Sequence, residues 1–572
     1  MNRRERRRLR KLSRKSRGID KRRAHATESE SEVPLATTLQ QAITFLHSGF
    51  PQEARHLCQQ VLATQPDHPE ALNLCGVTAF QLGDINEGLE LIQAAIAVKH
   101  DYVEAHNNLG NVLRALGRSD EAEAVYRRAA EINPNYFDAH YNRGILLESL
   151  ARLHEAENAY QRAVEINPDF PEASLNLGNV QKALGKLEKA VASYQRVLEI
   201  NPDHTDGHNN LGSVYHELGK FDEAVTAYRR ALDIKPDHVD AQYNLGVSLQ
   251  ELGELGDAAA AYRAAIDINA DYVKAHINLG YALQQLGKLD DAVAAYERAI
   301  AIDSHNAQVH SNLGDVLLER GEARAAVQVC DGYLKAHPGN TGVLAFKAVA
   351  LNELGERDSV RFLVDFDRFI RPTQFRTPPG FASLTDFNTA LAHHVCTHPT
   401  LVPAPTSHAT RLGKHSGELL IEQKGPIAVL EALIRRTVED YRQLLSADLT
   451  HPFLENPPQH FGLTAWGVVM ETQGHQIPHI HPSAWLSGVY YVQVPEIVRM
   501  PGQQHAGWIE FGRPPEHFHC KMDPEVKLIQ PKEGLMLLFP SYFYHRTVPF
   551  ETAERRISIS FDVLPLDELP DN

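Results

Sequence analysis

Three histidines lie within eight residues at 474–481, in the stretch GHQIPHIHPSAWLSGVYYV. His479 and His481 are separated by one residue, so on an extended chain both side chains leave the same face. His545 follows the apolar run GLMLLFP, and Arg556 and Ser558 share one face of the next run, RISISFDV. Paired imidazoles with a distant third can hold a transition metal, and a guanidinium offers paired donors to a carboxylate. The pattern predicts a metal centre beside an anion-binding arginine, with no catalytic residue beyond that centre.

The order of these residues resembles that of the 2-oxoglutarate- and Fe(II)-dependent oxygenases, whose double-stranded β-helix carries an H-x-D/E…H triad and a basic cosubstrate anchor. More narrowly, HIHPSAWLSGVYYV…FPSYFYHRTVPF…RRISISF is similar to a bacterial and phage branch with H-x-H-P-x-x-x-x-S-G-V-Y-Y. Similar proteins often carry tetratricopeptide repeats in front. The resemblance covers residues 464–563 well and residues 360–460 only loosely.

The resemblance implies a ligand set and a reaction. It implies Fe(II) held by His479, His481 and His545, with open positions for 2-oxoglutarate and O₂ and with ascorbate as a reductant. Arg556 would hold the far carboxylate of 2-oxoglutarate, and Ser558 would add a hydroxyl donor. The implied reaction is oxidative decarboxylation of 2-oxoglutarate to succinate, coupled to hydroxylation of a substrate C–H bond.

The second histidine departs from the wider family, because His481 stands where an acid is usual. Three arrangements stay open. Either three imidazoles hold the iron, or His481 lies behind the ligands and a carboxylate such as Glu471 or Glu510 replaces it, or the site binds metal poorly.

The residues around the histidines have less specific interpretations. Tyr490 and Tyr491 leave opposite faces of one strand, so one is expected in the core and the other beside the site. Trp466 and Trp485 are expected in the core. The stretch HFHC at 517–520 lacks a fourth ligand nearby and is interpreted as a loop.

The elements around these residues change character along the chain after residue 356. Short β-branched or aromatic runs follow residue 464, namely AWGVVME, SGVYYVQV, GWIEFG, GLMLLFP and RISISFDV, which is typical of an antiparallel roll. Upstream, DFNTALAHHV and IAVLEALIRRTVEDYRQLL predict helices, RPTQFRTPPGF a turn-rich joint and VPAPTSHATRLG a loop. We therefore expect a joint and helical lead-in at 357–463 and a double-stranded β-helix (jelly-roll) core at 464–572.

The preceding part repeats every 34 residues from about residue 36 to 356. Its small, large and proline positions resemble those of the tetratricopeptide repeat, in which two helices cannot bury their apolar stripe alone and stack on neighbours. The chain is therefore expected to be an α+β multidomain protein with an all-α solenoid of about ten units in front. The recurring glycine stands at Gly110, Gly144, Gly178, Gly212, Gly246, Gly280 and Gly314, each followed by alanine after twelve residues, and one step earlier at Gly76.

An asparagine stands two residues before the glycine in seven consecutive units. A residue at a fixed phase forms a row along a solenoid, and an amide can both donate to and accept from a peptide backbone. The row is similar to the asparagine ladder of the animal enzyme that attaches N-acetylglucosamine to proteins, which implies a bound protein or peptide. Bonding within or between units explains the asparagines equally well. They are Asn108, Asn142, Asn176, Asn210, Asn244, Asn278 and Asn312.

Charge and cysteine content limit the remaining classes. Residues 1–23 carry 13 Lys or Arg against two acids, so an arm at 1–35 is expected to be basic and disordered, while the rest of the chain is near −27 from a total of −16. Nucleic acid is therefore an expected partner only through that arm. The arm lacks the apolar core of a secretory signal, and no apolar stretch is long enough to span a bilayer. Five cysteines without close spacing argue against a disulfide framework and favour a cytoplasmic location.

Two functional classes fit the whole chain. The first is an oxygenase whose repeats recruit a protein or peptide for hydroxylation. The second is a non-enzymatic adaptor with a degenerate barrel, which the missing acid favours. Glycosyl transfer, suggested by the repeats alone, is excluded because the part after residue 356 leaves little room for a two-lobed nucleotide-sugar enzyme, and no Gly-rich phosphate loop follows a strand there.

Overall fold

The computed structural model describes residues 35–405, 409–421, 424–445, 451–455, 457–500, 502 and 504–566. The basic arm expected at 1–35 thus lies outside the described residues, apart from its last one. The chain divides into two compact units, with the boundary between Lys235 and Pro236. The domain limits expected at residues 356 and 463 stay predictions.

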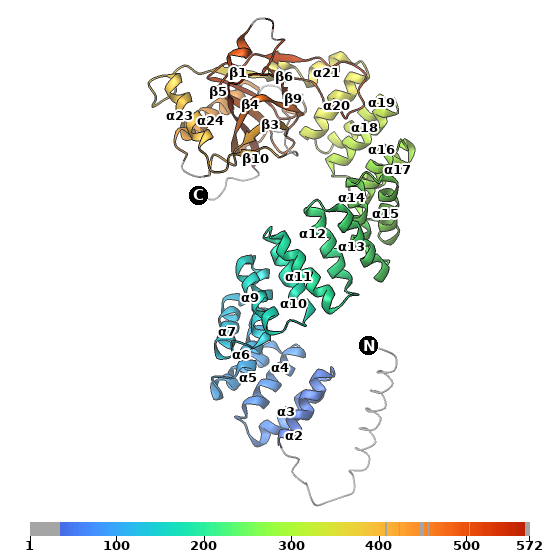
Figure 1. Cartoon of the computed structure of the whole chain (residues 1–572), viewed down its shortest axis with the longest axis vertical. Helices are drawn as coiled ribbons and strands as arrows, with labels where there is room; N and C mark the ends of the chain where they lie inside the picture. Colours follow the sequence, from blue (N-terminus) through green and yellow to red (C-terminus); the bar gives the residue numbers. More distant parts are fainter. Residues whose placement is uncertain are drawn as a thin grey trace, which may run out of the picture. The chain divides into compact units, whose positions relative to one another are not determined.

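The first unit is built of helical hairpins that follow the repeat period of the sequence (Figure 1). Consecutive helices pack against each other, and each hairpin packs on the next. Its helices are α2 (Leu35–His47), α3 (Pro51–Thr64), α4 (Pro69–Gln81), α5 (Ile85–Val98), α6 (Val103–Ala115), α7 (Ser119–Ile132), α8 (Phe137–Ser149), α9 (Leu153–Ile166), α10 (Pro171–Ala183), α11 (Leu187–Ile200), α12 (Thr205–Glu217) and α13 (Phe221–Ile234).

The recurring glycine permits the close crossing of the two helices in each unit. A Cβ added at Gly144 would lie 2.6 Å from the ring of Tyr160, sixteen residues later, and this ring is fully buried. The same pairing recurs with fully buried tyrosines in neighbouring units. Any larger residue would push the helices apart, because a packed interior has no space for an extra methyl group.

One expectation about the cysteines is wrong. Cys58 on α3 and Cys75 on α4 form a disulfide, with their Cα atoms 5.8 Å apart. Their separation of 17 residues spans one helix–helix connection, so two facing helices bring the thiols together although the spacing resembles no disulfide motif. Cys330, Cys396 and Cys520 are free.

The second unit begins with the last repeats and continues into the sheet. Gly314 meets the ring of Phe346 instead of a tyrosine sixteen residues on, because Cys330 occupies that position. The helices are α14 (Val239–Glu251), α15 (Leu255–Ile268), α16 (Val273–Gln285), α17 (Leu289–Ile302), α18 (Ala307–Glu319), α19 (Ala323–Leu334), α20 (Thr341–Glu353), α21 (Arg357–Leu363), α22 (Phe366–Phe369), α23 (Leu384–Cys396) and α24 (Pro426–Leu445).

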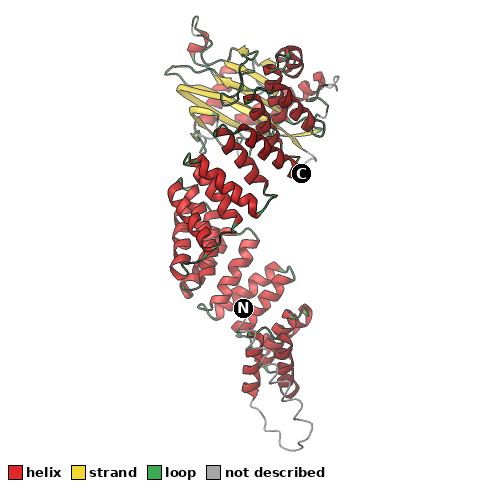
Figure 2. Ribbon diagram, turned by 90° about the vertical axis from the view of Figure 1, so that its right-hand side faces the viewer, coloured by secondary structure: helices red, strands yellow, loops and turns green. Residues whose placement is uncertain are grey.

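The strands form one curled antiparallel sheet, a half-barrel consistent with a double-stranded β-helix, which confirms the predicted fold class (Figure 2). The sheet order is β1-β8-β5-β10-β4-β9-β6-β7, with β3 also on β4 and β2 on β3. The strands are β1 (Arg371–Gln374), β2 (Val402–Pro403), β3 (Thr410–His415), β4 (His460–His479), β5 (Leu486–Gln493), β6 (Ile509–Phe511), β7 (Lys527–Ile529), β8 (Leu535–Pro540), β9 (His545–Thr547) and β10 (Arg556–Leu566).

The five predicted strand runs and both predicted helices are present. The segment expected to be a joint and a loop instead contributes β1, β2 and β3. Pro372 and Pro403 lie in two of these strands, and proline is compatible with an edge strand because it need not donate to a neighbour. Within the described ranges no helix is both long and apolar enough to cross a bilayer.

Candidate metal centre

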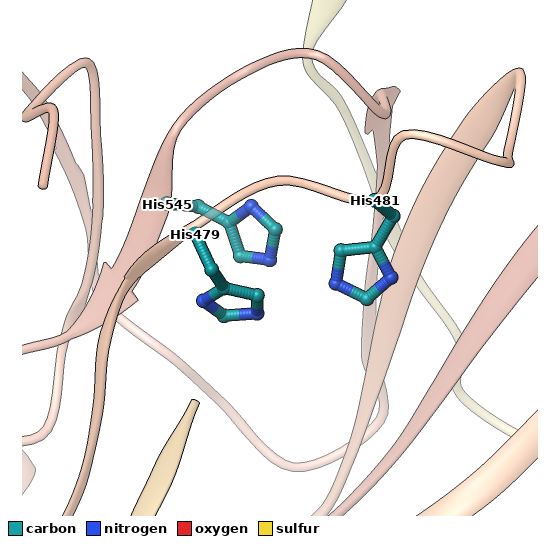
Figure 3. A group of neighbouring side chains, drawn as sticks. All are labelled: His479, His481 and His545. Carbon is teal, nitrogen blue, oxygen red and sulfur yellow. The ribbon is translucent and has the colours of Figure 1, made fainter. Parts of the chain in front are cut away.

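Three histidines from two distant segments meet at the inner side of the sheet. His479 is the last residue of β4 and pairs in register with His545, the first residue of β9. His481 follows two residues later, where its backbone N–H donates to Ser541 O over 3.1 Å. The ring centroids of His479 and His545 are 4.3 Å apart, and His481 lies 5.1 and 5.3 Å from them. Figure 3 shows one nitrogen of each ring turned toward a common space.

The separation of the ligand atoms suits one ion. One nitrogen from each ring lies within 4.8 Å of the others. Three evenly spaced nitrogens that each lie about 2.1 Å from one ion are at most about 3.6 Å apart. Each ring must therefore move inward by on the order of 1 Å for the group to bind a metal.

Each ring is oriented by an acceptor at its other nitrogen. Nδ1 of His479 lies 2.8 Å from Ile477 O, and Nδ1 of His545 lies 3.0 Å from Phe543 O. Nδ1 of His481 lies 2.7 Å from Oδ2 of Asp562. Because a carbonyl or carboxylate oxygen can only accept, each Nδ1 carries the proton and donates it. The lone pair is therefore on Nε2 in all three rings, which is the tautomer that a metal requires.

Burial keeps two of these rings neutral. It lowers the pKa of His479 to about 3, and the neighbouring His481 adds to this effect. Burial likewise lowers the pKa of His545 well below its usual value, with further contributions from His479 and His481. A neutral imidazole keeps its lone pair at physiological pH, as a metal ligand must.

Aromatic rings enclose the histidines. Trp466 stacks on His481 at a centroid distance of 5.7 Å and an interplanar angle of 17°. Phe539 lies 4.9 Å from His545. Trp485 is buried in the core as expected, whereas Trp466 lines the site, which corrects the expectation for that residue.

A narrow pocket lined by the three histidines extends to Arg556. Arg556 is 2% exposed, and its guanidinium lies 5.2 Å from the ring centre of Tyr491. Within the described residues, its Nε and the hydroxyl of Tyr491 are buried without a hydrogen-bond partner. Burial lowers the pKa of Arg556 and raises that of Tyr491 to about 12. Nη1 of Arg556 donates to Met470 Sδ over 3.7 Å, and among the described residues no carboxylate forms an ion pair with the guanidinium. A buried cation without a counter-charge is costly, so this end of the cavity fits the carboxylate of a ligand.

The other expected residues of this region separate into those beside the cavity and those away from it. Tyr490 faces the opposite side of β5, where its hydroxyl donates to Asn388 over 2.8 Å. Ser558 is buried on β10, but Ser560, two residues further on the same strand face, lines the cavity. The role of Ser558 stays a prediction, and Ser560 is a residue that the sequence interpretation missed.

The two glutamates considered as replacement ligands lie in ion pairs elsewhere. Glu471 accepts from Arg555 at the surface over 3.2 Å. Glu510 is buried between Arg546 and Arg513, which hold the pKa of its carboxyl below the usual value against the effect of burial. Neither belongs to the group of potential ligands found around the histidines.

Asp562 is the carboxylate of this site. It hydrogen-bonds to the potential ligand His481 and does not itself belong to the ligand group. Its Oδ2 accepts from His481, and its Oδ1 accepts from the hydroxyl of Ser487 over 2.6 Å. Asp562 lies six residues after Arg556 on the same strand, so the two-residue alternation of a strand places both on one face. That spacing was present in the sequence and could have identified it.

The asparagine row is half-buried and bonds between units. The amide nitrogens of five of these asparagines donate to a residue of the preceding repeat, and one of the five also lies within hydrogen-bonding distance of the tyrosine of that repeat's second helix. In the first unit Asn108 donates to Asn73, Asn142 to Asn107, Asn176 to Tyr141 and Asn210 to Asn179, over 3.0–3.3 Å. In the second unit Asn278 donates to Tyr243 and Tyr262, Asn312 accepts from Gln308, and Asn244 also has a partner.

Models of two kinds of family match separate parts of the chain. Residues 464–562 match a family model described as "Putative 2OG-Fe(II) oxygenase". Models of the tetratricopeptide repeat match residues 45–112, 110–150, 137–170, 159–192, 182–219, 212–253, 248–287 and 277–341. No curated protein matches the chain.

Solved structures resemble parts of the repeat region. One is YrrB, described as a TPR protein with an unusual peptide-binding site, at 25% identity and a TM-score of 0.31 over 32% of this chain and 95% of that one. MamA matches at 24% identity and a TM-score of 0.28 over 28% of this chain and 94% of that one. PilF of Pseudomonas aeruginosa matches at 17% identity and a TM-score of 0.32, over 37% and 96%.

Proposed function

We propose that this chain, which carries tetratricopeptide repeats in front of a 2OG-Fe(II) oxygenase domain, is a 2-oxoglutarate- and Fe(II)-dependent oxygenase that hydroxylates a protein or peptide. The observation that carries the proposal is one cavity with three converging imidazoles at one end and, at the other, the buried guanidinium of Arg556, whose Nε has no hydrogen-bond partner among the described residues. Such a cavity offers a ferrous ion nitrogen ligands and offers a dicarboxylate a cationic anchor.

Each residue of the cavity has a separate task in this proposal. Nε2 of His479, His481 and His545 would hold Fe(II), with Asp562 fixing the orientation of His481. Arg556 would hold the far carboxylate of 2-oxoglutarate, and the Tyr491 hydroxyl, buried beside the guanidinium, would donate to the same group. The aromatic rings of Trp466 and Phe539 exclude water from the metal side. When bound, iron with 2-oxoglutarate and O₂ supplies the oxidising chemistry.

The repeats would recruit the substrate polypeptide. Their asparagine amides donate between units, but an amide oxygen has two lone pairs and can still accept from a bound backbone. The cytoplasmic location belongs to the same proposal and is supported by the three free thiols. The disulfide between Cys58 and Cys75 counts against it, and a thiol count on protein from unreduced lysate decides the matter.

Succinate formation tests the activity. Purified protein is mixed with Fe(II), ascorbate, O₂ and labelled 2-oxoglutarate, and uncoupled turnover is followed as labelled succinate. We expect turnover that is lost in His545→Ala and kept in the matched control His475→Ala, since the ring of His475 hydrogen-bonds to Gln473 O and is not among the described residues that line the cavity. Equal turnover in both variants would refute the assignment of the metal centre.

A non-enzymatic adaptor is the second candidate, and the specific observation in its favour is His481 in place of an acid. In that case the protein takes up no Fe(II) and forms no succinate, also in the presence of captured partners. Metal uptake measured by elemental analysis separates the two functions before any substrate is known.

A further inference from the structure

The loop between β6 and β7 extends from the sheet onto the last repeats of the same unit. Its segment 517–522 lies against α18 and α20. These helices hold the backbone of the segment as well as its side chains. Backbone N–H groups of His519, Lys521 and Met522 donate to Asp315 and Glu353 over 3.1, 2.8 and 2.6 Å, and Met522 O accepts from Asn352 over 3.2 Å.

Side chains of the segment complete the contact. Nδ1 of His519 lies 3.3 Å from Asp315, and its Nε2 lies 3.4 Å from Glu319. The ring of Phe518 meets that of Phe346 edge to face at 5.3 Å. Asp315 is only 8% exposed, so its bonds to the loop are shielded from water and stronger than surface bonds.

The segment occupies the same helix face as the asparagine row. Asp315 and Glu319 follow Asn312 by three and seven residues, which places all three side chains on one face of α18. Phe346 occupies the asparagine position of the next unit, one full repeat after Asn312. The chain's own loop therefore covers the row at its C-terminal end, in the manner expected of a bound extended peptide.

A short path connects this contact to the metal centre. Phe511, the last residue of β6, pairs in register with His545, and the backbone N–H of Gly512 donates to Tyr544 O over 2.8 Å. The ring of Phe511 also lies 6.1 Å from that of His545. Only a few residues separate Phe511 from the docked segment, so its position restrains the strand that carries His545.

We propose that segment 517–522 is a built-in peptide ligand of the last two repeats, and that its docking through Asp315 and Glu353 positions β6 and with it His545. These two carboxylates are positioning residues for the metal centre. A recruited substrate cannot use the row on α18 and α20 while the segment is bound, so it must bind to earlier repeats. The docking itself does not depend on the proposed oxygenase activity.

Cys520 reports the docking directly, because it lies within the segment and burial raises the pKa of its thiol to about 12. The full-length protein is treated with N-ethylmaleimide, and the modification of each free cysteine is followed by mass spectrometry. In Asp315→Ala/Glu353→Ala we expect Cys520 to react at least about tenfold faster, as loss of the charge-assisted bonds to both carboxylates implies. Cys330 and Cys396 serve as internal references.

A matched control separates the effect of lost docking from the effect of removing any carboxylate on the repeats. Glu251 stands at the same phase as Glu353, three units earlier, with an exposed side chain. Glu251→Ala should leave the rate at Cys520 unchanged. Asp315→Asn/Glu353→Gln should restore slow modification in part, since an amide oxygen still accepts from a backbone N–H. An unchanged Cys520 rate in the double alanine variant would overturn the docking.

The visible spectrum of Co(II) bound to the protein reports the coupling to His545. We expect the double alanine variant to bind Co(II) at least about tenfold more weakly with an altered spectrum, and the amide variant to recover toward the wild type. Faster Cys520 modification with an unchanged Co(II) spectrum would overturn the coupling. If the wild type binds no Co(II), the proposed function and the coupling both fail, while the Cys520 rate still decides the docking.

Discussion

The three histidines are chemically alike, but the chain holds them by different means. His479 and His545 donate to backbone carbonyls two residues away on their own segments, so local strand geometry fixes their rings. His481 lies beyond the end of β4 and depends on Asp562, 81 residues later in the sequence. Its orientation therefore depends on a tertiary contact, which makes His481 the ligand most sensitive to substitution elsewhere.

The dependence of His481 on its carboxylate leads to a prediction for Asp562. In Asp562→Ala the proton on Nδ1 of His481 loses its acceptor, so the ring can rotate and the lone pair no longer faces the site. We expect Co(II) or Fe(II) affinity, measured by titration, to fall about 10–100-fold. Asp562→Asn should lose less, because its amide oxygen accepts the same bond. Equal metal affinity in wild type and Asp562→Ala would mean that His481 is not a ligand.

Arg556 should act on the cosubstrate and not on the metal. Removing its guanidinium in Arg556→Ala deletes buried charge-assisted hydrogen bonds to a carboxylate, each of which contributes about 1.5–3 kcal/mol. We expect the KM for 2-oxoglutarate to rise about 10–100-fold while Co(II) affinity stays within a factor of about two. Arg556→Lys keeps the charge but not the paired donors, so an intermediate KM is expected. Loss of metal from Arg556→Ala would show that the arginine has been assigned the wrong task.

Sequence spacing predicted the histidines better than their surroundings. His479 and His481 share a face by strand alternation, and one apolar strand places His545 opposite them, so local rules sufficed for these residues. Strand alternation also places Ser560 and Asp562 on the face of Arg556, but which of them reaches the histidines, and that Trp466 does so, follows only from the register of β10 against β4 and β5. That register depends on pairing between strands far apart in the sequence, which single-strand patterns do not contain.

At the scale of elements, the repeat period identifies one position where the chain departs from its own pattern. Two residues after the end of each first helix the backbone has a positive φ, at a residue that is glycine at Gly117, Gly185 and the equivalent positions of further repeats. Ala151 occupies this position between α8 and α9, with φ of 56°. An L-residue with a Cβ is strained there, while glycine is not.

Ala151→Gly should therefore stabilise the first unit, although glycine usually lowers the stability of a folded protein. Relief of the left-handed strain exceeds the added entropy of the unfolded chain, so we expect a gain of about 0.5–1 kcal/mol. The reverse change Gly185→Ala is the matched control, since no atom lies within 4 Å of the added Cβ and only backbone strain is introduced. The urea midpoint of the helical circular dichroism signal should rise in the first variant and fall in the second.

The elements that sequence did not predict have a common cause. β1, β2 and β3 are short, contain proline in two cases and depend on other strands such as β8 and β4 for their pairing, so their own residues show no strand period. The disulfide has the same origin, because it requires two helices to face each other. The helices and central strands were predicted because their period of 3.6 or 2 is written in consecutive residues.

At the scale of the whole chain, charge is divided unevenly along the sequence. Residues 1–23 carry 13 Lys or Arg against two acids, and the rest of the chain is near −27. The arm is thus the part of this chain suited to polyanions, because the strongly acidic remainder repels them at low ionic strength. Among the described residues, the metal centre is formed by His479 of β4, His481 and His545 of β9, with Arg556 of β10 lining the same pocket.

This uneven charge predicts that removing residues 1–23 abolishes polyanion binding and leaves the metal affinity of the centre unchanged. On a heparin column the full chain should be retained and elute as salt rises, since bound Lys and Arg release counterions from the polyanion. The shortened chain should pass unretained, and Co(II) affinity and the urea midpoint should stay at the values of the full chain. Retention of the shortened chain would locate a second cationic surface within the repeats or the sheet, and a change in Co(II) affinity would connect the arm to the site.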